Sequence, residues 1–74
     1  MKNYERIVCN QIYRFIRDYH KTYQYAPSTQ EIAMGVGVSL PTASRYINRM
    51  LERGELETDH KGQPRCLRVG DING

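Results

Sequence analysis

Cysteine is scarce in this sequence, and neither cysteine belongs to a recognisable ligand motif. The two cysteines are Cys9 and Cys66, and they fit neither a CxxC pair nor the Cys/His spacing of a zinc site. We therefore expect no metal and no cofactor. Because no signal peptide is evident, the simplest interpretation is two reduced, partly buried thiols in a cytoplasmic protein.

Long apolar runs are also missing. No run approaches the roughly 20 apolar residues that span a bilayer. Residues 1–11, MKNYERIVCNQ, lack the apolar core of an export signal. These absences predict a soluble, intracellular chain with no membrane partner.

No catalytic set is recognisable either. The two histidines, His20 and His60, are isolated. No Cys/His/Asp group is expected to converge, and the carboxylates are scattered over a solvated surface. We therefore expect no catalytic residues, and the chain is not predicted to be an enzyme.

Length and charge set the scale of the molecule. Its 74 residues make one small domain, and a domain of this size buries only about 60% of its unfolded surface. The net charge of +3 suits an anionic partner without requiring one. We expect one domain over residues 1–70 and a frayed tail over residues 71–74.

Apolar periodicity predicts a first helix from Tyr4 to about Tyr19. Its apolar residues recur three and four positions apart, as on an amphipathic helix. The stripe comprises Tyr4, Ile7, Val8, Ile12, Phe15, Ile16 and Tyr19. The following HKTYQYAP loses that period, and Pro27 biases Ala26 toward an extended conformation. We expect a loop from His20 to Pro27.

A short second helix is predicted after Ser28. Ser28 and Glu31 are spaced as a capping box, in which each side chain satisfies an amide at the helix start. The apolar side comprises Ile32, Ala33 and Val36. Gly37 is expected to end the helix, because the turn commonly requires positive φ. Gly35 inside the helix is expected to cost about 1 kcal/mol against alanine.

The third predicted helix has two distinct sides. It begins with Ser39 as N-cap or with Pro41 at its first position, and Gly54 closes it. The apolar side comprises Ala43, Ile47, Met50 and Leu51, and the opposite side comprises Pro41, Arg45, Asn48 and Glu52. We expect the first side to pack and the second to face outward.

Two short strands are predicted beyond Gly54. The first alternates Leu56 and Thr58 with Glu57 and Asp59, and the second alternates Leu67 and Val69 with Cys66 and Arg68. Between them, HKGQ followed by Pro64 is typical of a polar hairpin tip. The predicted fold class is mainly α with a small β-hairpin.

The segment from Ser28 to Gly54 is typical of a helix-turn-helix. Its helices must approach closely near the turn, which requires a small residue inside the first helix and bulky apolar residues beside the turn. The positions that meet this requirement are Ala33, Val36, Val38 and Ile47. A helix-turn-helix places its second helix in the DNA major groove.

Several segments resemble the N-terminal winged-helix domain of LexA-type SOS repressors. They are YAPSTQEIA, GVGVS, TASRYINRMLERGELE and PRCLRV. The resemblance implies a winged helix-turn-helix of three helices and a two-stranded wing that binds DNA. The turn between Gly37 and Thr42 is one residue shorter than in that family and closer to MarR-like and GntR-like winged helices. LexA-type repressors continue into a serine/lysine self-cleaving domain that also supplies the dimer, and we expect neither here.

The expected base contacts lie on the third helix, over residues 39–53. Its outward residues are Ser39, Leu40, Pro41, Thr42, Ser44, Arg45, Asn48 and Arg49. Arg45 is expected to donate a bidentate pair to guanine, Asn48 to pair with adenine or reach a phosphate, and the small Ser44 to let the helix sit deep. Leu40 and Pro41 either touch thymine methyl groups or finish the packing of the turn.

Two further groups are expected to meet the DNA backbone. Ser28 and Thr29, with the amides that start the second helix, lie where a phosphate usually binds, and the alternative for Ser28 is a plain cap. Lys61 and Arg65, on the wing over residues 59–65, bring positive charge to the backbone or minor groove. The alternative for the wing is a solvated hairpin tip.

Other interpretations stay open. The acidic side chains expected to mark the edge of the DNA footprint are Glu52, Glu55, Glu57 and Asp59, and Arg53 is expected to be solvated. The domain is alternatively a protein-interaction module, such as an anti-repressor or adaptor, or an architectural mobile-element protein such as an excisionase. Its six tyrosines suggest base stacking on single strands, but the spacing places Tyr4 and Tyr19 in the core. The expected partners are double-stranded DNA and either a second copy on DNA or another protein.

Overall fold

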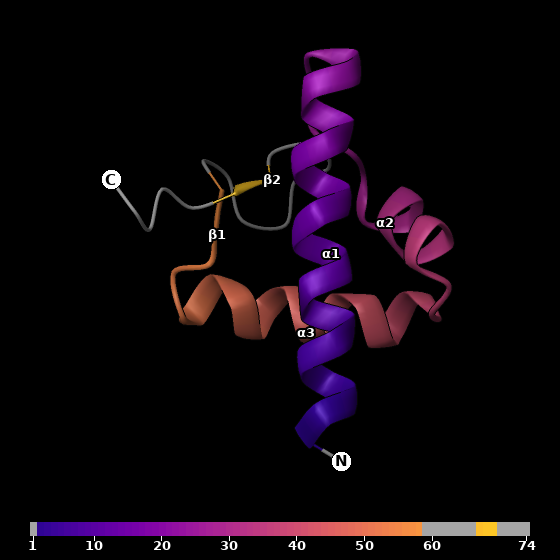
Figure 1. Ribbon diagram of the computed structural model, residues 1–74, viewed down its shortest axis with the longest axis vertical. Helices are drawn as coiled ribbons and strands as arrows, with labels where there is room; N and C mark the ends of the chain where they lie inside the picture. Colours follow the sequence, from indigo (N-terminus) through magenta and orange to yellow (C-terminus); the bar gives the residue numbers. More distant parts are fainter. Residues whose placement is uncertain (1, 59–66, 70–74) are drawn as a thin grey trace.

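The computed structural model describes residues 2–58 and 67–69, which form three helices and two short strands (Figure 1). In chain order these are α1 (Lys2–Tyr23), α2 (Thr29–Val36), α3 (Leu40–Glu52), β1 (Leu56–Thr58) and β2 (Leu67–Val69). Figure 1 shows α1 crossing α3, with α2 on one side of α1 and the strands on the other. α1 packs against α2, α3 and β2. The fold is therefore mainly helical, as predicted.

α1 is longer than the sequence predicted. It runs to Tyr23, one turn beyond the predicted end at Tyr19, so the loop begins at Gln24 rather than His20. The rings of Tyr19 and Tyr23 have centroids 4.5 Å apart, because side chains four residues apart are neighbours on a helix surface. Gln24 then adopts a φ of 66°, which ends the helix.

α1 also buries a narrower stripe than predicted. Ile12 and Ile16 are fully buried, whereas Tyr4 is 55% and Ile7 54% exposed. At about 100° per residue, Ile7 points about 140° away from Ile12. Figure 1 shows that the N-terminal turns of α1 extend past α3. The prediction that Tyr4 and Ile7 belong to the buried stripe is therefore wrong.

α2 begins and ends where predicted. Ser28 Oγ accepts a hydrogen bond from the Glu31 N–H at 3.1 Å, and Glu31 Oε1 accepts one from the Ser28 N–H at 2.9 Å. The capping box is confirmed. Gly37 follows with a φ of 89°, and its N–H donates to the Ala33 carbonyl. That left-handed conformation is the one that favours glycine at the end of a helix.

Gly35 has a packing role that the sequence did not reveal. A Cβ atom added to Gly35 would lie 2.1 Å from Cε2 of Phe15 on α1, well inside van der Waals contact. Helix propensity alone treats this glycine as a cost of about 1 kcal/mol against alanine. In the folded chain it lets the Phe15 ring lie directly on the backbone of α2.

α3 shows the predicted two-sided pattern. Ser39 is its N-cap and accepts a hydrogen bond from the Thr42 N–H at 3.3 Å, while Pro41 occupies the first turn. Leu40 is the first helical residue, so Ser39 is the cap as predicted and Pro41 takes the second helical position rather than the first. The buried residues of α3 are Ala43, Tyr46, Ile47 and Met50. Gly54, with a φ of 81°, follows the end of the helix, as predicted.

β1 and β2 pair in antiparallel register, with Leu56 opposite Val69 and Thr58 opposite Leu67. Leu56 and Leu67 are buried and belong to the core that the helices share. Part of the predicted hairpin lies outside the described residues. That part comprises the tip over residues 59–65 with His60, Lys61 and Arg65, and the strand ends Asp59 and Cys66. The predicted tail over residues 71–74 also lies outside the described residues.

The part of the chain that the structure describes contains neither a candidate membrane-spanning helix nor a candidate metal site. None of its helices combines the length and apolar character needed to cross a bilayer. Within residues 2–58 and 67–69, no group of three or more His, Cys, Asp or Glu side chains is placed to hold a metal ion.

Candidate nucleic-acid interface

The outer side of α3 is exposed and polar. Pro41, Arg45 and Asn48 are exposed, and Ser44 beside them is half-buried. Within the described residues, the side chains of Arg45 and Asn48 take part in no hydrogen bond or ion pair. Their donors and acceptors therefore face solvent from the side of α3 opposite the core.

The first turn of α3 presents small and apolar groups. The Ser39 hydroxyl donates to Thr42 Oγ1 at 2.8 Å and also accepts from the Thr42 N–H, so the cap orients both side chains. Leu40 is 49% exposed and Pro41 is exposed. Neither belongs to the buried core, so their apolar surface is accessible to a partner.

The start of α2 is occupied by its own cap. Ser28 and Thr29 are half-buried there. The capping box holds the Glu31 carboxylate at the same helix end, where negative charge complements the helix dipole. A phosphate that approached Ser28 and Thr29 would meet this carboxylate. The geometry therefore gives direct support to the interpretation of Ser28 as a cap.

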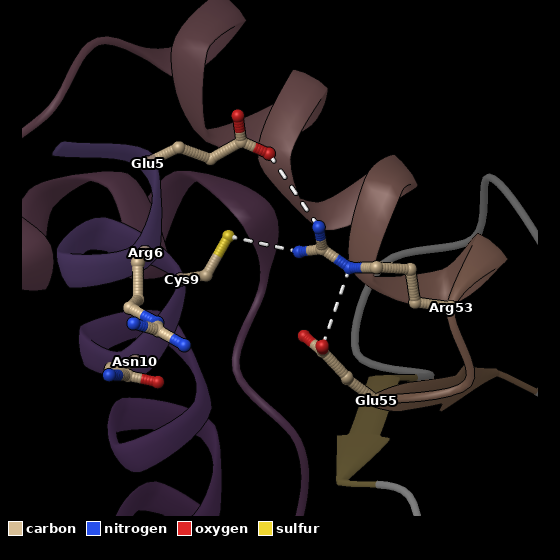
Figure 2. A pocket seen from close by; sticks show the side chains of 6 residues that line it. All are labelled: Glu5, Arg6, Cys9, Asn10, Arg53 and Glu55. Atoms are coloured by element: carbon tan, nitrogen blue, oxygen red, sulfur yellow. Dashed lines mark hydrogen bonds and ion pairs between the residues drawn. The ribbon is translucent and has the colours of Figure 1, made fainter. Parts of the chain in front are cut away.

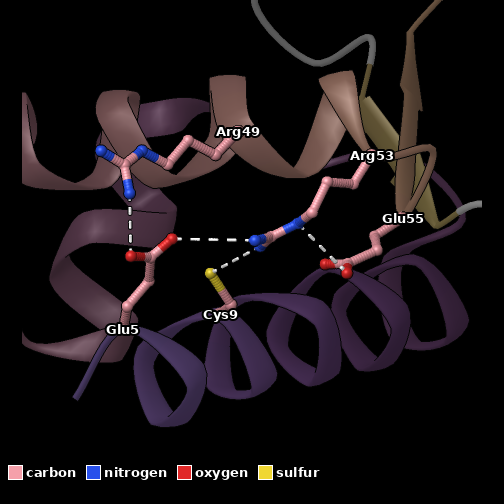
Figure 3. A network of polar contacts seen from close by, with 5 residues as sticks. All are labelled: Glu5, Cys9, Arg49, Arg53 and Glu55. Carbon is pink, nitrogen blue, oxygen red and sulfur yellow. Dashed lines mark hydrogen bonds and ion pairs between the residues drawn. The ribbon is translucent and has the colours of Figure 1, made fainter. Parts of the chain in front are cut away.

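The C-terminal half of α3 is joined to α1 by charged contacts (Figure 3). Arg49 Nη1 donates to Glu5 Oε1 at 2.8 Å. Arg53 Nη1 lies 3.7 Å from Glu5 Oε2, and its Nε lies 3.3 Å from Glu55 Oε2. Arg53 Nη2 also donates to Cys9 Sγ at 3.6 Å. We call these five residues the Glu5 network. Arg53 is exposed, as expected of a solvated side chain, and it is also paired with two carboxylates.

Sequence periodicity did not reveal the Glu5 network, because its members on α1 and α3 are separated by 44 positions. One signal was nevertheless present. Glu5 precedes Ile12 by two helical turns and therefore lies on the same, buried side of α1. A carboxylate on a buried side requires a partner, and the arginines of α3 supply it.

Residues of the same region line a pocket of about 470 Å³ (Figure 2). The lining residues are Glu5, Arg6, Cys9, Asn10, Arg53 and Glu55. Figure 2 shows Arg53 reaching across from the end of α3 toward Glu5, Cys9 and Glu55, whereas Arg6 and Asn10 stand apart on α1. The pocket thus combines both signs of charge, and most of that charge is already paired.

Two pKa values are displaced in the Glu5 network. Burial raises the pKa of the Cys9 thiol above its ordinary value of 9.0, and the hydrogen bond from Arg53 offsets only part of this. Because the thiolate is the nucleophilic form, Cys9 is a poor nucleophile at neutral pH. The hydrogen bond to Glu5 raises the pKa of the Arg49 guanidinium, so Arg49 remains a cation.

Aromatic rings gather near the other end of α1. The Tyr19 ring lies 5.8 Å from Phe15 and 5.6 Å from Tyr25, measured between centroids. Tyr23 and Tyr25 remain 53% and 48% exposed, and Tyr46 on α3 is buried. Tyr19 is half-buried beneath its neighbours. Rings that pack on one another have fewer free faces for stacking on bases, so this cluster gives little support to single-strand binding.

The predicted contact residues therefore fall into three groups. The largest lies along α3 and comprises Ser39, Leu40, Pro41, Thr42, Ser44, Arg45, Asn48 and Arg49. Ser28 and Thr29 lie at the start of α2, and Lys61 and Arg65 lie outside the described residues. No protein-family model matches this sequence, and no curated protein matches it either.

Proposed function

We propose that this chain is a winged helix-turn-helix domain that binds double-stranded DNA sequence-specifically, as a small transcriptional regulator. The order of its elements supports the proposal. A tight turn at Gly37 joins α2 to α3, and two antiparallel strands follow α3. In such an arrangement the second helix of the motif enters the major groove, so α3 is the proposed recognition helix and the strand pair belongs to the wing.

The resemblance to the N-terminal domain of LexA-type repressors is part of the same proposal. It concerns the DNA-binding head and carries no claim of self-cleavage. A single domain of this size offers few contacts. We therefore propose that two copies pair on a palindromic site, as half-site proteins commonly do, or that another protein brings the domain to DNA.

The observation that carries the proposal is the unpaired polar side of α3. Arg45 and Asn48 are exposed, lie three residues apart, and have no partner among the described residues. Ser44 lies between the buried side of α3 and the side that carries Arg45 and Asn48. Because its side chain is small, it permits α3 to approach the floor of a DNA groove closely. An arginine and an asparagine on one helix face form the donor and acceptor set that reads guanine and adenine edges.

Binding would combine two kinds of contact. Arg45 would donate two hydrogen bonds to O6 and N7 of a guanine, and Asn48 would pair with an adenine or a phosphate. Each good base contact is worth about 1 to 3 kcal/mol of discrimination. Lys61 and Arg65 are proposed to add sequence-independent attraction to the backbone.

A salt titration on mixed-sequence duplex DNA tests DNA binding directly. We expect the logarithm of the association constant to fall by about 0.9 for each phosphate contacted per tenfold rise in salt. Fluorescence anisotropy of a labelled duplex measures this. The proposal would be overturned if neither the native chain nor the Glu5→Gln variant, which has one negative charge fewer, bound DNA at low salt.

Selection of bound sequences from a random DNA pool then tests sequence specificity. We expect an enriched motif, and a palindromic motif would establish that two copies bind together. Enrichment of no motif by a chain that does bind DNA would contradict sequence-specific recognition and would favour an architectural role.

Two observations favour a protein-interaction module as the second candidate. Arg49 and Arg53 are already paired with carboxylates, and Leu40 and Met34 expose apolar surface. A module of this kind would show no salt-dependent DNA binding. The titration above therefore separates the two candidates.

A further inference from the structure

Three arginines follow one another at intervals of four residues: Arg45 and Arg49 on α3, and Arg53 at its C-cap. Residues with this spacing are neighbours on a helix surface, so the three form an arginine row that winds from the outer side of α3 toward α1. Their partners differ. Arg49 and Arg53 both reach Glu5 (Figure 3), whereas Arg45 has no ion pair within the described residues.

Glu5 is placed to serve two arginines at once. One carboxylate oxygen accepts the hydrogen bond of Arg49 at 2.8 Å, and the other lies 3.7 Å from Arg53. The Glu5 side chain is only 26% exposed, against 49% for Arg49 and 47% for Arg53. Its position on the buried side of α1 fixes it beside α3, because Val8 and Ile12 anchor that side in the core.

We infer that Glu5 limits the positive charge that α3 offers to DNA. By engaging Arg49 and Arg53, it leaves Arg45 as the member of the arginine row that no carboxylate of the described residues neutralises. Glu5 is thus a positioning residue that lowers affinity for DNA of arbitrary sequence. Selectivity then depends more on base contacts than on phosphate attraction. The inference rests on the proposed DNA binding.

Arg53 and Arg49 are restrained to different degrees. Arg53 contacts Glu5, Glu55 and Cys9, so the loss of Glu5 leaves two of its contacts in place. Arg49 has Glu5 as its single ion-pair partner among the described residues. Arg49 is therefore the arginine that a change at Glu5 releases, and it lies one turn from Arg45 on the same row.

The expected size of the effect follows from counterion release. Glu5→Gln removes one negative charge and preserves the shape of the side chain. The neutral amide no longer neutralises the charge of Arg49, which becomes available for one further phosphate contact. One such contact steepens the salt slope by about 0.9 and tightens binding about fifteenfold at about 50 mM salt, falling to about fourfold at about 200 mM.

α1 offers a matched control. Asp18 pairs with Arg17 through a contact of 3.1 Å on the exposed surface of the same helix. Asp18→Asn removes the same charge from the same helix, about 20 Å from Glu5 along its axis. That distance exceeds the Debye length of about 10 Å at 0.1 M salt. We therefore expect Asp18→Asn to change affinity for mixed-sequence DNA less than about twofold.

The experiment measures anisotropy of a mixed-sequence duplex with the native chain, Glu5→Gln, Asp18→Asn and the double variant Glu5→Gln/Arg49→Ala across a salt series. We expect a gain for Glu5→Gln that the double variant loses. Circular dichroism at the assay temperature monitors folding. A further variant, Arg49→Ala in the native background, is expected to change mixed-sequence affinity little, because Glu5 already holds Arg49.

The outcomes separate this inference from the proposed function. If the native chain binds DNA and Glu5→Gln and Asp18→Asn change its affinity equally, the proposed role of Glu5 is overturned. The proposal of DNA binding would still stand. A gain that persists without Arg49, or a large loss from Arg49→Ala in the native background, would also overturn the role of Glu5. Absence of binding by the native chain and by Glu5→Gln alike would overturn the DNA-binding proposal itself.

Discussion

The two halves of α3 carry similar polar residues but hold them by different means. The first half is organised locally, since Ser39 caps it through contacts with Thr42 and Arg45 projects without a partner among the described residues. The second half is organised by residues distant in the sequence, since Arg49 and Arg53 are tied to Glu5 on α1. An exposed arginine can therefore already be paired with a carboxylate and so be less available to a binding partner. The difference between the two halves decides which arginine charges a partner can contact.

The largest expected effect concerns the core beneath the second half. Met50 is 1% exposed, and Met50→Ala is expected to lower the free energy of unfolding by about 2 to 5 kcal/mol through lost burial and a residual cavity. Urea unfolding followed by circular dichroism measures this. Asn48→Ala, on the exposed side, is expected to stay within about 0.5 kcal/mol. Similar losses for both variants would contradict the two-sided packing of α3.

The comparison of the halves is tested next through their arginines. On the duplex obtained by selection, Arg45→Ala is expected to cost about 1 to 3 kcal/mol of binding free energy through lost base contacts. Arg53→Ala is expected to cost much less, because its guanidinium is already engaged. Equilibrium titrations of both variants measure the difference. Equal losses would reject the assignment of base contacts to the first half of α3.

A smaller effect is expected at the cap of the first half. Ser39→Ala removes the oxygen that accepts the Thr42 N–H, which is expected to lower the free energy of unfolding by about 1 kcal/mol. Ser44→Ala on the same helix is the matched control and is expected to leave stability unchanged or slightly higher. Thermal unfolding of both variants checks this. A loss from Ser44→Ala that equals the loss from Ser39→Ala would contradict the capping role.

The smallest effect is expected from pH at the second half. Burial raises the pKa of the Cys9 thiol above 9.0, so the thiol of the unfolded chain loses its proton first as pH rises. The contribution of the protonated Cys9 thiol to the free energy of unfolding is therefore fully present below pH 9.0. It is lost as pH rises through the higher pKa of the folded state. Urea unfolding from neutral to alkaline pH, in a Cys66→Ser background, measures the loss. Cys9→Ala is expected to show a shallower decline, and identical declines would contradict the burial effect.

The starts of α2 and α3 and the end of α2 were the most predictable features of this fold. The capping box of Ser28 and Glu31, the cap at Ser39 and the turn at Gly37 were all predicted, and all are confirmed. These signals act within one helical turn, between groups whose spacing along the chain fixes their spacing in space. The buried side of α3 was predictable for the same reason, because helical period determines which residues share a side.

Other features required the packed structure. The exposure of Tyr4 and the packing role of Gly35 against Phe15 depend on how far α3 and α2 extend along α1. Helical periodicity predicts the direction in which a side chain points. It does not predict whether another helix or strand packs against that side chain. The longer course of α1 through Tyr23 likewise depends on ring contacts that form only after the helix has continued.

The sequence by itself therefore determined α2 and α3, their caps and the polar outer side of α3, because each depends on residues no more than a few positions apart. Only the tertiary structure decided which arginines of that helix are paired. Glu5 and Arg49 are 44 positions apart, and a charge pair over that separation exists only because packing of α1 on α3 brings the two helices together.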